Sequence, residues 1–307
     1  MKKMTLGLAV AALVCCAQKV NAQYYFYNDK YYETDLLFDV GVSAGGMNCF
    51  TDLGGKKGAG KKFIKDLNMK NTQLSGGVYV AATYKSVVAL RLEATFGKIK
   101  AYDSILKNEK SDPRSRYQRN LNFRSNITEF SAVAELHPMY LMLKDDQEPP
   151  RLSPYLLGGV GLFSFRPQAQ LNNTWVDLEP LRTEGQGFKE YPDRKRYKLT
   201  QMNIPIGAGV RYEASSMITA RFEIVHRILS TDYLDDVSKM YIDPTLFANY
   251  LSPVQAAVAT QLADRRAAVN PGIVPGTADI RGDSRDNDAF FSVNLKIGIT
   301  LGRQRYK

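Results

Sequence analysis

The sequence predicts an all-β fold, an eight-stranded antiparallel transmembrane β-barrel with long extracellular loops. Eight segments alternate apolar and polar residues with a period of two, which is the period of a β-strand. The connections between these segments are sorted into short turns and long loops. The chain also begins with the features of an export signal. In a transmembrane barrel the apolar side chains face lipid and the polar side chains fill the lumen.

Residues 1–22 have the features of a secretory signal peptide. Two lysines precede a short apolar stretch, and a small-residue cleavage site ends at Ala22. The apolar stretch is too short for a membrane-spanning helix. A lipoprotein signal at Cys15 and Cys16 is the alternative, although the residues before them lack the usual small side chain. We therefore expect a signal peptide over 1–22 and an outer-membrane β-barrel domain over 23–307.

Each expected strand has an apolar face and a more polar face. The clearest is the last strand, where Phe291, Leu295 and Ile299 share one side and Asn294 and Lys296 lie on the other. In order, the expected strands cover residues 36–44, 74–84, 88–96, 127–136, 155–165, 201–212, 218–228 and 291–301.

Two of these strands depart from the simple pattern. Both faces of the strand at 155–165 are apolar, so either Leu156 and Val160 or Tyr155 and Leu157 could face the lipid. The strand at 201–212 contains Pro205, which has no N–H group to donate to a β-ladder.

The connections alternate in length along the chain. Tight turns at 85–86 and 214–216 join two pairs of strands, and a somewhat longer turn joins another pair. The remaining connections are long and cover roughly residues 46–72, 100–122, 166–197 and 230–287. This sorting is typical of bacterial outer-membrane barrels, whose short turns lie in the periplasm. A helix is expected in the last loop from 253 to about 269, because 254, 257, 258, 261 and 262 form a helical stripe.

Charged residues occur on the faces that would point into the lumen, and their signs balance. They are Asp39, Arg91, Glu93, Glu129, Glu135, Arg211, Arg221, Glu223, Arg227 and Lys296. An eight-stranded barrel is only wide enough to be filled by side chains, and buried charges must be paired. The sequence therefore predicts a closed lumen held by ion pairs. A path for protons or ions is the alternative interpretation.

Few residues could support metal or cofactor chemistry. Cys49 is the only cysteine after the signal, and His137 and His226 are far apart in the sequence. We therefore expect neither a disulfide nor a cofactor. One acidic group in the last loop could bind calcium, although it lacks the spacing of an EF-hand: Asp283, Asp286 and Asp288. Solvated acids are the simpler interpretation.

The chain carries a formal net charge of +10. Its basic groups, such as the lysines at 56–62 and the bases at 194–196, are most simply interpreted as solvated loop residues, and attraction to outer-membrane lipid phosphates or anionic surface sugars is the functional alternative. Nucleic-acid binding is not expected, because the chain has no stacking motif and carries an export signal.

Several segments resemble a known family. They lie at residues 45–48, 52–55, 153–159, 183–187, 204–209 and 223–227. The most specific segment continues to Ser238 and begins with Thr231, Asp232, Tyr233, Leu234, Asp235 and Asp236. In these residues the chain resembles the PorG-type outer-membrane β-barrels of Bacteroidota. The resemblance covers most of the chain after the signal.

The resemblance implies a role in the type IX protein secretion machinery. It implies that the protein lies in the cell outer membrane after Sec-dependent export and associates with a periplasmic ring of the lipoprotein PorK and its partner PorN. Not every such barrel need have this role, so a paralogue outside the machinery is the alternative. An aromatic segment before the first strand is the candidate for partner binding, with an interfacial aromatic girdle as the alternative: Tyr24, Tyr25, Phe26, Tyr27, Tyr31 and Tyr32.

Two other functions stay open beside this non-enzymatic role. One is a surface-binding barrel or adhesin. The other is a lipid-modifying barrel enzyme. The alternation places His226 toward lipid near the outer end of its strand, where it could act beside a serine and an acid, and Ser230 and Asp232 are near it in the sequence. A histidine in the aromatic belt at the membrane interface is the simpler interpretation of His226.

Overall fold

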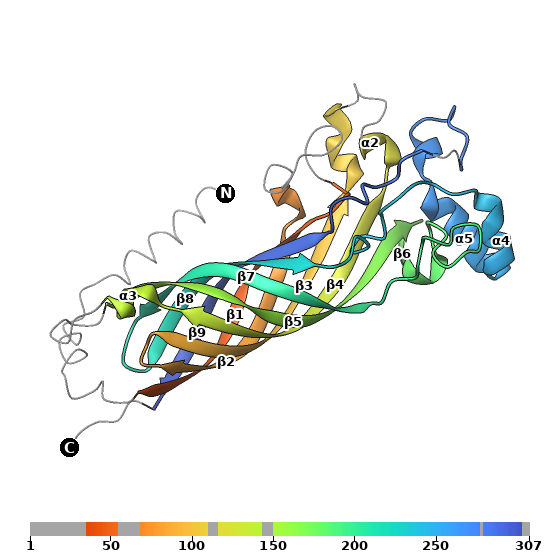
Figure 1. Ribbon diagram of the computed structural model, residues 1–307. Helices are drawn as coiled ribbons and strands as arrows, with labels where there is room; N and C mark the ends of the chain where they lie inside the picture. The colour runs from red at the N-terminus through yellow and green to blue at the C-terminus, as the bar shows by residue number, and fades with distance from the viewer. Residues whose placement is uncertain (1–34, 55–67, 110–115, 143–149, 277–278, 303–307) are drawn as a thin grey trace, which may run out of the picture.

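Eight antiparallel strands close into a ring in the computed structural model, which describes residues 35–54, 68–109, 116–142, 150–276 and 279–302 (Figure 1). Each strand of the ring pairs with the next, and β9 pairs with β1 to complete the closure. The ring consists of β1 (Leu36–Phe50), β2 (Gln73–Tyr84), β3 (Val88–Tyr102), β4 (Asn122–Leu136), β5 (Leu152–Leu171), β7 (Thr200–Glu213), β8 (Ile218–Leu229) and β9 (Ala289–Leu301). The predicted eight-stranded barrel is therefore confirmed.

The predicted signal peptide over 1–22 and the aromatic segment before β1 lie outside the described residues. So do the lysines at 56–62.

The two ends of the barrel differ in their connections. Short turns join β2 to β3 and β7 to β8 at one end, where β4 also connects to β5; we call this the short-turn end. The four long loops all connect strands at the other, long-loop end, where their described residues pack together (Figure 1). At the short-turn end, Lys85 and Ser86 both adopt positive φ angles, as a two-residue hairpin turn requires.

Several strands extend beyond their predicted ends at the long-loop end. The strand β3 continues from 96 to Tyr102, and β5 continues to Leu171, where it pairs with the unpredicted strand β6 (Thr174–Asp177). Polar residues such as Lys98 face outward on these extensions, so the apolar alternation that marks the membrane-facing part ends there. The sequence pattern therefore predicted the membrane-facing part of each strand and not its full length.

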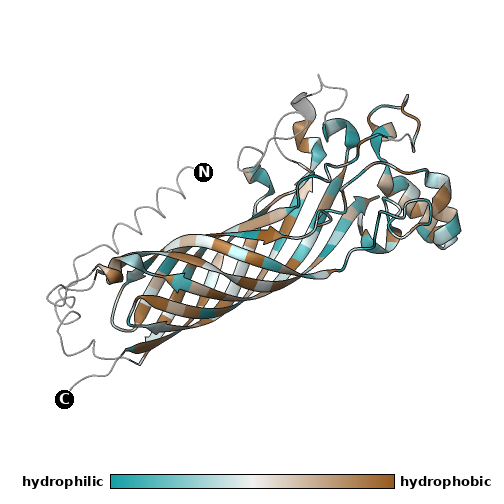
Figure 2. Ribbon diagram, viewed as in Figure 1, coloured by the Kyte–Doolittle hydropathy of each residue, from teal (hydrophilic) through white to brown (hydrophobic). Residues whose placement is uncertain are grey.

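The outward face of the barrel is apolar. Two neighbouring rows of side chains run across the strands at mid-height; one contains Val40, Val80 and Leu92, and the other contains Phe130 and Leu162. These side chains are exposed in the isolated molecule, and residues of both rows line one apolar hollow. Figure 2 shows the alternation of hydrophobic and hydrophilic residues along the strands and the more hydrophilic loops at one end.

The structure shows which face of β5 points outward and how β7 accommodates its proline. In β5, Leu156 and Val160 are exposed, whereas Tyr155 and Leu157 point inward and are buried. In β7, the pairing with β5 is interrupted opposite Pro205, while the pairing with β8 continues through it. The missing N–H group is therefore accommodated on the β5 side of the strand.

The helices are short and lie in the connections. No helix in the described part of the chain is long and apolar enough to span a membrane. The helices are η4 (Met69–Asn71), η5 (Asp103–Glu109), α2 (Arg116–Arg119), α3 (Pro138–Leu141), η6 (Glu179–Leu181), η7 (Pro244–Leu246), α4 (Phe247–Tyr250), α5 (Pro253–Ala263) and η8 (Arg266–Ala268).

The helix predicted from 253 to about 269 is present as α5, but it ends at Ala263. Its capping box, formed by Ser252 and Gln255, defines the start. The predicted apolar stripe was right at Leu262, which is buried, and wrong at Val254, which is exposed; it also omitted the buried Ala259. Small side chains let this helix approach the neighbouring loop closely, and an apolar stripe does not reveal such packing.

The outward position of Leu92 generates a prediction. Leu92→Arg places a cation in the hydrocarbon near mid-height and should destabilise the barrel by about 2–4 kcal/mol. Asn294→Ala, on the lumen face, removes the hydrogen bond that Asn294 donates to Ser292 and the one it accepts from Ser75, and should cost about 1–2 kcal/mol. Urea titration in lipid vesicles, read by heat-modifiable gel migration, measures both losses. Equal losses would contradict the assignment of the two faces.

Candidate functional site

All ten of the charged residues singled out in the sequence point into the lumen and are buried. Their side chains form two groups of ion pairs, one nearer the short-turn end and one nearer the long-loop end. The ten residues are Asp39, Arg91, Glu93, Glu129, Glu135, Arg211, Arg221, Glu223, Arg227 and Lys296.

Arg91 is the centre of the first group. From β3 it pairs with Glu135 on β4, and its other guanidinium nitrogens lie 3.2 Å from Glu93 and 3.0 Å from Glu223. Lys296 on β9 also lies 2.7 Å from Glu223 and pairs with Glu93. Two cations and three carboxylates from four strands therefore form one compact cluster.

Arg221 continues this group toward the short-turn end. Its two terminal nitrogens donate to Glu135 at 2.7 Å and to Asp39 at 2.6 Å. Thr300 also donates to Asp39. Because each carboxylate is shared between partners on different strands, the charges connect β1, β4, β8 and β9 across the lumen.

The second group is centred on Glu129 and Arg227. The guanidinium of Arg227 donates to both carboxylate oxygens of Glu129, with distances of 2.9–3.3 Å. Asn203 donates to the same carboxylate at 2.7 Å, and Arg227 also donates to Ser292. This bidentate pair holds β4 against β8 below the long loops.

Sequence reasoning missed several members of the lumen network. Glu213, one residue beyond the predicted strand, is buried 3.4 Å from Arg211, which lies 3.7 Å from Asp39. His137 is fully buried between Glu135, at 3.4 Å, and Ser153, at 3.3 Å. Alternation could have identified Glu213 had the strand been extended by one residue.

Large aromatic side chains fill the space between the charges. The ring of Tyr79 is buried within 6 Å of Arg91, Arg221 and Lys296. It lies against Gly41 and Gly298, where a Cβ atom would come within 2.6 Å or less of the tyrosine. Glycine on the lumen face therefore makes room for the tyrosine, and the lumen at this level is occupied by protein.

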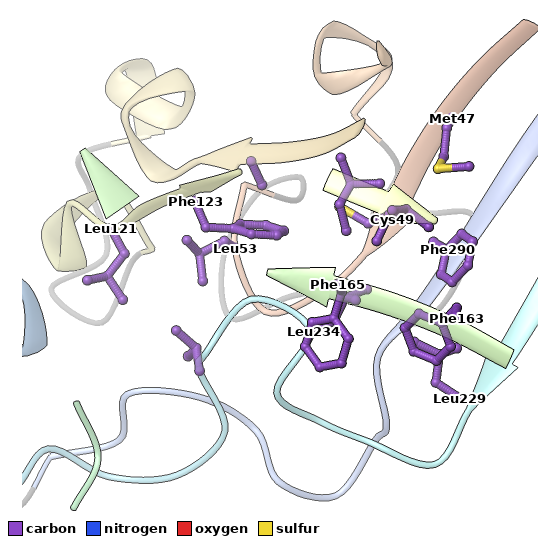
Figure 3. Close-up of a cluster of buried hydrophobic side chains, with 14 residues drawn as sticks. Met47, Cys49, Leu53, Leu121, Phe123, Phe163, Phe165, Leu229, Leu234 and Phe290 are labelled. Carbon is purple, nitrogen blue, oxygen red and sulfur yellow. The ribbon is translucent and has the colours of Figure 1, made fainter. Parts of the chain in front are cut away.

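A hydrophobic cluster fills the mouth of the barrel at the long-loop end (Figure 3). Phe163 and Phe165 on β5 stack with centroids 5.4 Å apart, and Phe290 on β9 packs 5.6 Å from Phe163. Leu234 and Leu53, which come from two different long loops, belong to the same buried cluster. The loops therefore close the barrel with an apolar layer. We call this layer, together with the described loop residues that pack directly over it, the cap.

The segment Thr231–Asp236, the most specific of the resemblance, lies inside the cap. Leu234 donates its N–H to Asp288 at 2.8 Å, and Leu53 donates its N–H to Asp235 at 3.2 Å. Asp236, which adopts a positive φ of 65°, accepts from Tyr197 at 2.7 Å and from Thr183. The segment thereby connects three of the long loops.

The segment at 183–187 packs directly against it. Glu184 is fully buried and accepts from the N–H groups of Ser238 and Lys239, both at 3.0 Å. Arg281 pairs with Glu184 at 2.9 Å and also donates to the Asp236 carbonyl. Two of the resemblance segments are therefore partners within the cap. Sequence reasoning missed Glu184 and Arg281 as a pair because they lie far apart in the chain.

The loop between β3 and β4 joins the cap through Arg119. It pairs with Asp103 at 3.3 Å and donates to the carbonyls of Asp52 and Arg281. Asp103 accepts from the N–H groups of Gly54 and Leu121, both at 3.2 Å. Through these contacts all four long loops share one buried polar network.

Four carboxyl groups in the cap resist ionisation. Burial raises the pKa of Asp232 to about 9 and the pKa of Asp235 to about 8. Burial also raises the pKa of Asp236 to about 7 and the pKa of Asp288 well above its ordinary value. Repulsion from Asp52 adds to the effect of burial at Asp235 and Asp288.

The possible calcium ligands do not converge. Asp288 is buried and holds the Leu234 N–H, whereas Asp283 and Asp286 lie at the surface. No group of three or more acidic, histidine or cysteine side chains suited to a metal ion occurs among the described residues.

His226 faces outward near the membrane-facing part of β8. Its ring lies 5.9 Å from Phe50, which stacks on Phe291 at 5.1 Å. This is the environment of an aromatic belt. Asp232 belongs to the buried acidic group of the cap, and Ser230 is exposed at its edge.

A second body, which we call the lobe, projects from the cap beside β6 (Figure 1). Helices α4 and α5 pack there on the loop between β6 and β7. Phe188 stacks on Tyr250 with centroids 4.0 Å apart, and Phe247 meets Phe188 edge-on. The long loops thus carry a small hydrophobic core of their own.

The unequal pairing of two lumen arginines generates a prediction. Arg221→Met leaves Asp39 without its closest cation and removes one of the two guanidinium groups that pair with Glu135, so it should cost about 3–5 kcal/mol. Arg211→Met should cost less, because the Arg211 guanidinium makes no hydrogen bond within the described residues. Urea unfolding in vesicles measures both variants. A larger loss for Arg211→Met would contradict the network described above.

The cap should loosen as the pH rises. Because the folded-state pKa values of Asp232, Asp235 and Asp236 are raised, their stabilising contribution is complete at low pH and is lost as pH rises through about 7–9. Hydrogen exchange of amides in 231–238, corrected for intrinsic rates, should accelerate over this range while β8 stays protected. Asp235→Asn removes one titratable group, so the exchange rates in 231–238 should increase less between pH 7 and 9. Protection that increases from pH 6 to 9 would refute the expected sign.

No protein-family model matches the chain, and no curated protein matches it in sequence. One similar solved structure is Ail, the attachment invasion locus protein of Yersinia pestis, in complex with the heparin analogue sucrose octasulfate, with 6% identity and a TM-score of 0.38 over 87% of this chain and 100% of that chain. The outer membrane protein OprG from Pseudomonas aeruginosa has 8% identity and a TM-score of 0.35 over 88% and 97%. Neisserial surface protein A has 8% identity and a TM-score of 0.35 over 87% and 97%.

These likenesses are too low to carry an argument about function. The strand pairing, the outward apolar rows and the charged lumen carry the assignment of the fold. The described part of the chain is an eight-stranded antiparallel β-barrel of the outer-membrane type.

Proposed function

We propose that this protein is a non-enzymatic outer-membrane component of the type IX secretion machinery and that it associates with a periplasmic ring. The observation that carries the proposal is the closed barrel. Its lumen is occupied by paired charges, and its long-loop end is covered by a cap that joins four loops. Such a barrel suits a fixed anchor in a larger assembly better than a channel for solutes.

The choice of machinery rests on the sequence resemblance. Its most specific segment, Thr231–Asp236, and the segment at 183–187 contact each other inside the cap. These segments therefore support a shared architecture of the cap, and they leave the ring-binding surface to be found elsewhere. In this proposal the cap faces outward, so the short-turn end faces the periplasmic ring of PorK and PorN.

The described surface at the short-turn end offers apolar contacts for a ring. Met139, Leu141 and Met142, in and after α3, are exposed there. We propose that they act together with the aromatic segment at 24–32, which lies outside the described residues. Aromatic residues and methionine are enriched at protein interfaces relative to the rest of the protein surface.

A surface-binding barrel is the second candidate, and the lobe favours it. A hydrophobic body on the loops is more than a membrane anchor requires. Val254 is exposed on its helix α5, and Val274 is exposed on the segment that follows η8. In this function the lobe, and not the short-turn end, would contact the ligand.

One pair of variants distinguishes the two candidates. Met139, Leu141 and Met142 changed together to serine should weaken co-purification with PorK and PorN in mild detergent and lower secretion. The matched variant Val254→Ser with Val274→Ser, at the opposite end, should leave both at wild-type level. A short-turn variant that folds, retains the ring and secretes normally would remove this surface from the proposal. Loss of cell-surface adhesion in the lobe variant alone would favour the surface-binding function.

The enzyme alternative has its own test. We propose that His226 is part of the aromatic belt formed with Phe50 and Phe291. His226→Ala should therefore leave the lipid A profile of the outer membrane unchanged, as mass spectrometry of extracted lipid A would measure. A changed profile in cells that secrete normally would favour a lipid-modifying activity.

A further inference from the structure

Four cations face outward on the barrel wall just beyond the apolar band. They are Lys98 and Lys100 on β3, Arg124 on β4 and Arg166 on β5, and we call them the outer-wall basic patch. The three strands are neighbours in the ring. None of these cations belongs to the lumen network or to the cap.

The strand register places the four cations in two adjacent rows. Lys98 lies opposite Asn126, which lies opposite Arg166. In the next row toward the long-loop end, Lys100 lies directly opposite Arg124. Neighbouring strands are about 4.8 Å apart, and alternate residues of a strand are about 7 Å apart. All four side chains can therefore reach a single anionic group.

The charge of the patch is poorly compensated. Arg166 lies 3.6 Å from Asp177, and both side chains are substantially exposed. Among the residues that the structure describes, no carboxylate lies within ion-pair distance of the other three cations. The patch therefore keeps a strong positive charge at a single place on the wall.

Neighbouring side chains hold Arg124 in position. Its Nε donates to Gln168 at 3.0 Å, and its guanidinium lies 4.2 Å from the ring of Trp175 on β6. Gln168 in turn donates to Asp177 at 2.8 Å. The amino group of Lys100 lies 5.9 Å from the ring of Tyr102. Amphipathic aromatic rings beside cations are suited to a ligand that combines sugar and phosphate.

The position of the patch limits what can occupy it. Below it along the strands, Phe96 and Thr128 share a transitional row, and Phe130 and Leu162 belong to the apolar band. Lys98 follows Phe96 by two residues, or about 7 Å along the strand. A ligand at this height is therefore presented at the membrane surface, with apolar chains alongside the band.

We propose that the outer-wall basic patch binds the phosphate of a phosphorylated glycolipid in the surrounding outer leaflet. Lys98, Lys100, Arg124 and Arg166 contact the phosphate, and Trp175 packs beside the sugar. The acyl chains lie along Phe130 and Leu162. This inference rests on the proposed placement of the long-loop end outside, and it is independent of a role in secretion.

Native mass spectrometry of the full chain in detergent, titrated with bisphosphorylated lipid A, tests the proposal. The variant with Lys98, Lys100, Arg124 and Arg166 all changed to glutamine should bind about tenfold more weakly or worse. The control variant changes four exposed cations elsewhere in the loops to glutamine: Lys70, Lys189, Lys195 and Arg285. It carries the same change in net charge and should bind within about twofold of wild type.

Folding of each variant is checked by heat-modifiable migration. If the fourfold variant does not fold, Lys98→Gln with Lys100→Gln, both on the outer wall, should still weaken binding about threefold. Equal binding by a folded patch variant, or an equal loss in the control variant, would overturn the proposal.

Two competitors identify the source of the phosphate. Wild-type protein should bind dephosphorylated lipid A as weakly as the patch variant binds bisphosphorylated lipid A. If wild type binds the two forms of lipid A equally tightly, phosphate recognition is overturned. Inorganic phosphate should displace lipid A only at large molar excess. Displacement at equal concentration would assign the patch to free phosphate and overturn the glycolipid assignment.

Discussion

The pairing of charges inside the barrel is the constraint on which the rest of the structure depends. An eight-stranded ring leaves space only for side chains, so charges on its inner face must find partners across the lumen instead of water. Arg91 meets this constraint with three carboxylates from β3, β4 and β8, and Arg221 joins Asp39 on β1 to Glu135 on β4. A slip of one residue in any of these strands would turn its charge toward lipid and leave its partner unpaired. The ion pairs therefore specify the register of the barrel as well as filling it.

The same requirement shapes the cap. Backbone N–H groups of the loops are removed from water there, and buried carboxyl groups accept their hydrogen bonds: Asp288 from Leu234, Asp235 from Leu53 and Glu184 from Ser238. The charge state differs from that in the lumen, because burial and repulsion from neighbouring acids raise the pKa of Asp235 to about 8 and the pKa of Asp288 well above its ordinary value, so both stay protonated near neutral pH. The cap is therefore the pH-sensitive part of the molecule, and the lumen is the part held by paired charges.

The strands and the lumen residues could be predicted because alternation with period two depends only on neighbours in sequence. The faces of β9 and the inward charges on β8 follow directly from it. The extension of β5 and the strand β6 could not be predicted, because beyond the lipid the outward face becomes polar and the inward face apolar, which is the reverse of the membrane-facing pattern. The pair Glu184 and Arg281 joins two loops that have no periodicity, so only the folded chain brings it together. The outer-wall basic patch was hidden for a related reason, since its four cations come from strand extensions that the pattern did not reach.

The central claim is that this barrel is closed by its own side chains. Single-channel recording of the purified full chain in planar bilayers tests it most directly. The account predicts no stable conductance from wild type, because the aromatic and charged side chains around Tyr79 and Arg91 occupy the lumen and the cap covers its outer mouth. A steady open conductance from every inserted molecule would contradict the account.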